Sequence, residues 1–109
     1  MTTPTERIRA LNDQLRTTGQ GGDFVVTRGI ASLDLRTKVA IYAAVQAFDR
    51  FTTDNDPYGE HDFGLLEVAG HRIMFKIDYY DTNMTYLSPD PSDPQVTRRV
   101  LTILLTSEY

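Results

Sequence analysis

Hydrophobic residues near the start of the chain recur at the spacing of a helix. Ile8, Leu11 and Leu15 lie three or four positions apart, so they share one face of a helical segment. Residues 3–6 read TPTE, which combines an N-cap threonine, a proline at the first helical position and a capping-box glutamate. The glycines in GQGG at 19–22 permit the left-handed backbone that ends a helix. The pattern predicts a first helix between these signals.

The spacing of hydrophobic residues in the next two segments predicts first a strand and then a second helix. Residues 23–29 read DFVVTRG, a short β-branched run bounded by glycine, which predicts a strand. Ser32 or Asp34 can then cap a second helix that runs to about Arg50. Its apolar positions are Leu35, Val39, Ala43, Val45, Phe48 and Phe51. A helix that is apolar over much of its circumference is expected to be covered on several sides.

Two alternating runs around Ala69-Gly70 predict a β-hairpin. These runs are FGLLEV at 63–68 and HRIMFKIDYY at 71–80. A two-residue turn pairs Val68 with His71, Glu67 with Arg72, Leu66 with Ile73 and Gly64 with Phe75. Alternation in the second run places Ile73, Phe75, Ile77 and Tyr79 on the core face and Met74, Lys76, Asp78 and Tyr80 on the other. We expect Glu67 and Arg72 to attract each other, and Phe75 to cover the gap beside Gly64.

The C-terminal third is predicted to add one strand and one helix. Asp81-Thr82-Asn83 is typical of a turn, and residues 84–87 would form a third strand. After the proline-rich stretch, Asp93 and Pro94 would begin a last helix, with Val96, Val100, Ile103 and Leu104 as its buried stripe. The predicted fold class is α+β: a single domain, residues 1–109, with a mainly antiparallel sheet and three helices in the order α-β-α-β-β-β-α.

The amino-acid composition is typical of a single globular domain without a membrane helix. The chain has 109 residues, 40% of them hydrophobic, which is typical of one globular domain, and no apolar run approaches the ~20 residues of a membrane helix. It contains no cysteine, which excludes disulfides, zinc-thiolate sites and a cysteine nucleophile. The N-terminus has no pattern of a secretory signal. We therefore expect a cytoplasmic protein.

The acidic residues are concentrated in the second half of the chain. Residues 1–50 carry seven Lys and Arg against five Asp and Glu, whereas residues 51–109 carry four against ten. A surface with this sign repels phosphate backbones and attracts a basic partner or a cation. We therefore expect a protein partner with a basic surface, with neither direct nucleic-acid binding nor membrane binding.

The stretch DNDPYGEHD at 54–62 is the densest group of ionisable side chains. Asp54, Asp56 and Gly59 match positions 1, 3 and 6 of an EF-hand loop, but Leu65 stands where the bidentate glutamate belongs. One hypothesis is an oxygen-ligand site for Mg²⁺ or Ca²⁺ in a hydrolase or phosphodiesterase, with His61 as general base. Its ligands would be drawn from Asp54, Asp56, Glu60, Asp62, Asp78 and Asp81. The other interpretation is a tight loop that satisfies its own backbone.

The hypothesis that we favour is a non-enzymatic binding surface with no metal and no cofactor. Exposed tyrosines beside acids are common at protein interfaces. The candidate partner-binding residues are Asp54, Asp56, Tyr58, Glu60, His61, Asp62, Asp78, Tyr80 and Asp81. A homo-oligomer formed through an exposed sheet edge is a further possibility.

Four blocks of the sequence resemble a known family. NDPYGEHDFG at 55–64, KIDYYD at 76–81, SPDPSDPQVTRRVLTILLTSEY at 88–109 and IRALNDQLR at 8–16 are similar to blocks of a small bacterial family of unknown function, found especially in alphaproteobacterial genomes and plasmids. The resemblance implies no catalytic residues. It implies a setting on mobile elements, where anti-restriction and anti-CRISPR proteins occur, and hence an accessory or inhibitor protein.

Overall fold

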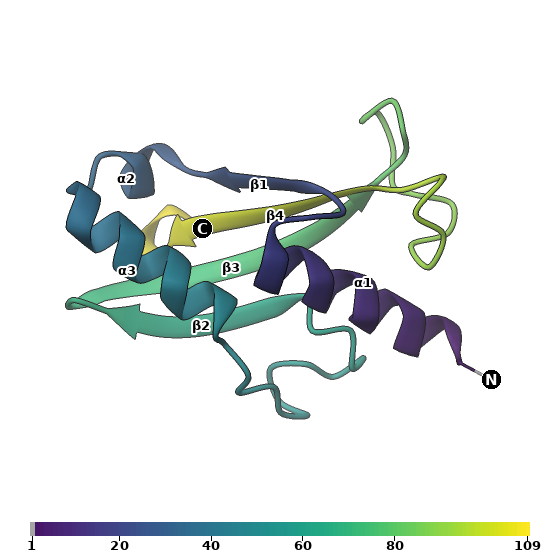
Figure 1. The fold of residues 1–109 in the computed structure, drawn as a ribbon, viewed down its shortest axis with the longest axis horizontal. Helices are drawn as coiled ribbons and strands as arrows, with labels where there is room; N and C mark the ends of the chain where they lie inside the picture. Colours follow the sequence, from purple (N-terminus) through teal and green to yellow (C-terminus); the bar gives the residue numbers. More distant parts are fainter. Residues whose placement is uncertain (1) are drawn as a thin grey trace.

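The computed structural model describes residues 2–109 and has an α+β fold, as predicted (Figure 1). Its elements are α1 (Pro4–Thr18), β1 (Asp23–Val26), α2 (Arg28–Ala31), α3 (Leu35–Gln46), β2 (Phe63–Val68), β3 (His71–Tyr80), β4 (Arg98–Leu105) and the 3-10 turn η1 (Thr106–Glu108). The four strands form one sheet in the order β1-β4-β3-β2. β1 is parallel to β4, and the other pairs are antiparallel.

The three α-helices pack on one face of the sheet and form the core there. Leu15, Ile30, Ile41, Val45 and Phe48 from the helical side contact Ile73, Phe75, Ile77, Leu101 and Ile103 of β3 and β4. The other face carries Met74, Val100 and Leu104, which are buried but lie outside this core cluster. We call it the open face.

The helix signals are confirmed at α1. The Thr3 side chain accepts a hydrogen bond from the N–H of Glu6 at 3.1 Å. Gly19 ends the helix with a φ of 76°, in the left-handed region, as expected of a glycine there. These two residues fix where α1 begins and ends.

The second predicted helix is shorter and less covered than expected. Asp34 caps α3 by accepting from the N–H of Thr37 at 2.7 Å, but the helix ends at Gln46, and a separate turn, α2, precedes it. The expectation that α3 is covered on several sides is wrong. The sheet covers only the side that carries Ile41 and Val45, so Leu35 and Val39 stay 74% and 56% exposed.

The predicted hairpin is confirmed residue for residue. Val68 pairs with His71, Glu67 with Arg72, Leu66 with Ile73 and Gly64 with Phe75. Ala69 and Gly70 both have positive φ, as a type I′ turn requires. However, Glu67 with Arg72 is not among the ion pairs that form within 4.0 Å in the described residues.

Two predictions for the C-terminal third are wrong. Residues 84–87 form a loop whose one link to β3 is a bridge between Tyr80 and Leu87, and the predicted last helix is strand β4. Asp93 accepts from the N–H of Gln95 at 2.9 Å, which is a turn and not a helix cap. β4 is central in the sheet and buried on both faces, so its apolar residues are nearly continuous, and such a run also satisfies helical spacing.

Candidate functional site

Most of the candidate residues lie in two loops at one end of the sheet. Residues 52–62 precede β2 and residues 81–97 follow β3, and antiparallel pairing brings both loops to the same end (Figure 1). Together they contain seven Asp and Glu and no Lys or Arg. We call these two loops the acidic end.

Asp56 is turned inward and supports the first loop. Its side chain is buried, and its Oδ1 accepts from the N–H of Glu60 at 3.0 Å and from that of His61 at 3.1 Å. His61 has a φ of 56°, which is unusual for a residue with a side chain. Asp56 therefore compensates for a strained turn and gives the loop a fixed shape.

His61 is held between two carboxylates. Its Nδ1 lies 2.8 Å from Asp13 Oδ1 on α1, and its Nε2 lies 3.7 Å from Asp56 Oδ2. Its ring stacks on Phe51 with centroids 3.9 Å apart. A general base needs a nitrogen directed at the substrate. In this arrangement both nitrogens face groups of the protein, and His61 fastens the loop to α1.

A buried polar network centred on Asn12 joins the first loop, α1 and β4. The Asn12 amide donates to the Glu60 backbone oxygen at 2.9 Å and to the Tyr79 hydroxyl oxygen at 2.8 Å. The Tyr79 hydroxyl in turn donates to Glu60 Oε1 at 2.7 Å. Arg99 Nε donates to Asn12 Oδ1 at 2.7 Å, and its guanidinium lies 5.1 Å from the Tyr79 ring centroid. Arg99 also donates to the backbone oxygen of Pro91, so the network reaches the second loop.

Burial sets the protonation of this network. It raises the pKa of Tyr79, and the hydrogen bond to Glu60 raises that pKa further, so the hydroxyl stays a donor. Burial also lowers the pKa of Arg99. No sequence signal marked Asn12 as a buried polar residue, and the sequence pattern predicted a helix at Arg99. Once β4 is known to be a strand, Arg99 is expected on the core face, because residues two positions apart in a strand share a face and Leu101 and Ile103 lie in the core.

Asp62 is half-buried among other acids. Burial raises the pKa of its carboxyl, and the charges of Glu60, Asp56 and Asp78 raise it further. The folded-state pKa therefore lies above the ordinary value of 3.8, so the folded state resists ionisation of Asp62. This penalty is absent below pH 3.8, grows as the pH rises through the raised pKa, and is complete above it.

Asp62→Asn is therefore expected to increase the free energy of unfolding at neutral pH. Below the ordinary aspartate pKa the variant and the wild type should unfold at the same urea concentration, because Asp62 is then uncharged in both states. Urea unfolding across this pH range measures the difference. Asp54→Asn, at an exposed position, is the matched control and should leave stability unchanged both at neutral pH and below the ordinary aspartate pKa. A stability gain that persists in acid would contradict the role given to burial.

Other residues of the acidic end face the solvent. Tyr58, Tyr86 and Leu87 are 78%, 75% and 78% exposed, and Met84 is also exposed. Asp81 and Asp90 accept hydrogen bonds from backbone N–H groups of their own loop. The bonds from the hydroxyl and N–H of Ser92 hold the pKa of Asp90 below its ordinary value, so this carboxylate stays charged. Supporting the loop does not remove the negative charge.

The strand residues among the candidates lie beside this end. Asp78 and Tyr80 are half-buried on the open face, where Asp78 Oδ2 pairs with Lys76 Nζ at 2.6 Å. The structure thus brings Asp56, Glu60 and His61 together where the first loop is fastened to α1. We call these contacts of the first loop with α1 the clamp. The structure leaves Asp54 and Tyr58 exposed on the first loop, and places Asp78, Tyr80 and Asp81 along the end of β3.

The geometry offers little to the metal-hydrolase hypothesis. Within residues 2–109, no three His, Asp or Glu side chains are grouped so that they could hold a metal ion. Three hollows of about 350 to 380 Å³ lie elsewhere, on α3 and the sheet edges, and none is lined by the acidic end. No described helix has the length and apolar character needed to cross a membrane.

Comparisons with known proteins give a family and no activity. The model of a family described as a protein of unknown function, DUF3768, matches residues 26–108. No curated protein and no solved structure matches the chain. The matched region contains both loops of the acidic end, whereas the IRALNDQLR block of α1 lies before it.

Proposed function

Since the chain belongs to the DUF3768 family, whose function is unknown, we propose a function from its own surface: it is a non-enzymatic protein-binding module. One observation carries this proposal. The acidic end combines six exposed or half-buried carboxylates and no Lys or Arg in its two loops with the exposed apolar side chains of Tyr58, Met84, Tyr86 and Leu87. Exposed apolar groups rimmed by polar and charged residues are typical of protein-interaction sites.

The two kinds of side chain have different roles in binding. The negative field steers a basic partner toward the loops and rejects acidic ones. Tyr86 and Leu87, which are adjacent in sequence and 75% and 78% exposed, supply the apolar area that a partner pocket can bury. The clamp of Asp56 and His61 on α1 holds the first loop in one shape, which lowers the entropic cost of binding. The partner therefore has an apolar pocket with a basic rim.

Within this class, the partner that we propose is a nucleic-acid-binding protein of a defence system. Such a protein presents a basic groove for phosphates, and the carboxylates of the acidic end would occupy it in their place. The protein would then act as an inhibitor. It would not bind nucleic acid itself, because its own loops repel phosphate.

The experiment compares two double variants in pull-downs from host cells. Tyr86→Ala with Leu87→Ala removes the proposed anchor, and Leu35→Ala with Val39→Ala removes similarly exposed apolar residues from α3 as a matched control. The partner captured by the wild type should bind the first variant at least about tenfold more weakly, the loss typical of an interface anchor. The control should bind within about twofold of wild type. Equal binding by all three proteins would refute the proposal.

A further inference from the structure

The outer edge of β2 carries backbone groups that nothing in the described chain pairs. Val68 and His71 flank the two-residue turn, so they are a hydrogen-bonded pair, and such pairs alternate along the hairpin. Gly64, Leu66 and Val68 therefore bond to β3, consistent with the bond from Ile77 N–H to the Asp62 oxygen at 2.8 Å. The backbone groups at 63, 65 and 67 point outward. No backbone hydrogen bond from another described segment reaches them.

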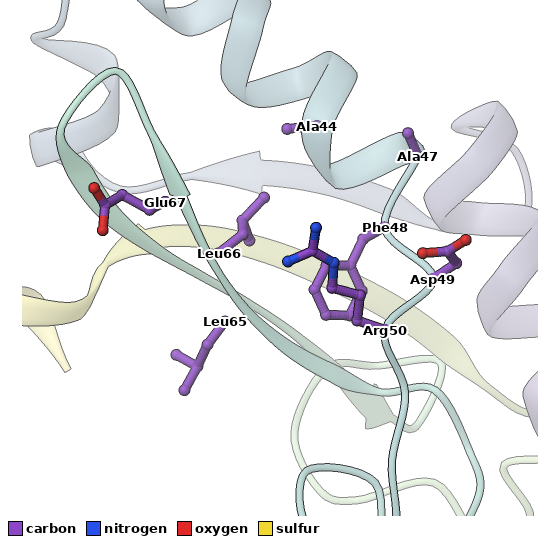
Figure 2. A pocket seen from close by; sticks show the side chains of 8 residues that line it. All are labelled: Ala44, Ala47, Phe48, Asp49, Arg50, Leu65, Leu66 and Glu67. Carbon is purple, nitrogen blue, oxygen red and sulfur yellow. The ribbon is translucent and has the colours of Figure 1, made fainter.

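Hollows on both sides of this edge leave room for a strand. One, of about 370 Å³, lies between β2 and the end of α3, where the short side chains of Ala44 and Ala47 leave space (Figure 2). Another, of about 380 Å³, is lined by Arg72, Ile73 and Thr106. Leu65, Leu66 and Glu67 of β2 line both hollows. Figure 2 shows Leu66 directed toward α3 and Leu65 directed away from it, so the edge presents side chains in both directions.

We propose that two copies of the protein pair through this edge. The β2 strands would run antiparallel about a two-fold axis, with Leu65 opposite Leu65 of the second copy. The result is one continuous eight-stranded sheet, in which the unpaired groups at Leu65 of each strand bond to the other.

Three features favour a second copy as the occupant. Leu104, Met74 and Leu65 lie in one row across the open face, and the axis joins this row to its copy, so that Leu65, which is 54% exposed in one copy, lies beside Leu65 of the second copy. The charged residues along the edge are of both signs: Asp49 and Arg50 line one hollow, Glu67 and Arg72 the other. The edge therefore does not repel its own copy. Antiparallel pairing also keeps the two acidic ends at opposite ends of the dimer.

Leu65→Pro tests the pairing directly. Because the N–H of Leu65 points outward, proline removes an edge donor without removing a bond between β2 and β3. Sedimentation over a concentration series should give a dimer for the wild type and a monomer for Leu65→Pro, with circular dichroism showing that the variant is folded. A wild type that is monomeric at every concentration would overturn the proposal, and so would a folded Leu65→Pro variant that dimerises like the wild type.

Leu65→Cys gives a readout that does not depend on tolerance of proline. The chain has no cysteine, so any disulfide must join two introduced thiols. Opposed residues of a strand pair lie ~5.5 Å apart at Cα, within disulfide range. Mild oxidation should link Leu65→Cys into a covalent dimer much faster than Leu87→Cys, although Leu87 is more exposed. Equal rates would overturn the pairing. The Tyr86→Ala and Leu87→Ala variant should remain dimeric, which separates this result from partner binding.

Discussion

Asn12→Leu is expected to lower the free energy of unfolding by about 3 kcal/mol, the largest effect that we predict for a single substitution. Leucine has nearly the same shape but removes the acceptor for Arg99 Nε and the donor to the Tyr79 and Glu60 oxygens. Asn12 and Arg99 are 0% and 1% exposed, so water cannot replace the lost partner. Removing one partner of a buried charged group costs about 3 to 5 kcal/mol, and the remaining bond to Pro91 puts this case at the low end.

Urea unfolding followed by circular dichroism measures this loss. Gln14→Leu is the matched control, because Gln14 lies on the exposed side of the same helix, and its replacement should change stability by less than about 0.5 kcal/mol. A loss below about 1 kcal/mol for Asn12→Leu would contradict the claim that this network fastens α1 to both loops.

Gly64→Ala is expected to cost about 2 kcal/mol by overpacking. A Cβ atom at Gly64 would overlap the ring of Phe75 and lie 2.8 Å from Phe48 Cε1. The rings of Phe48 and Phe75 pack edge to face with centroids 5.3 Å apart, and Phe75 is fully buried, so neither can move aside easily.

A double-mutant cycle tests the cause of that loss. Phe75→Leu opens space beside Gly64, so the second substitution Gly64→Ala should cost much less in the Phe75→Leu background than in the wild type. Thermal unfolding of the four proteins gives the coupling. Additive losses would mean that Phe75 is not the group that excludes a side chain at Gly64.

Local signals predicted the elements that depend on local physics. The hairpin followed from alternation and a two-residue turn, and the start of α1 followed from its N-cap threonine and the proline after it, because a few adjacent residues determine both. β4 was missed because a strand buried on both faces has no alternating pattern. Its position between β1 and β3 is a property of the whole sheet, and no local signal carries it.

For the acidic end, the sequence predicted the density of carboxylates but not their orientation. The density of carboxylates in residues 54–62 is visible in the sequence, but which of them turn inward depends on where α1 packs. Asp13 and Asn12 lie 48 residues from the groups that they hold, His61 and Glu60, and no motif connects them. The strand predicted over residues 84–87 did not indicate that Tyr86 and Leu87 are both exposed, because one face of a strand is expected to pack against the core.

The dissociation constant of the captured partner, measured at low and at high ionic strength, tests the central claim most directly. Asp54→Asn removes an exposed charge from the acidic end. Ala40→Lys is the control, because it changes the net charge of the protein by the same amount at an exposed position on α3, away from the acidic end. We predict that high salt weakens binding of the wild type, and that Asp54→Asn weakens binding at low salt more than Ala40→Lys does. An affinity that is unchanged by salt and equal in all three proteins would contradict recognition by the acidic end.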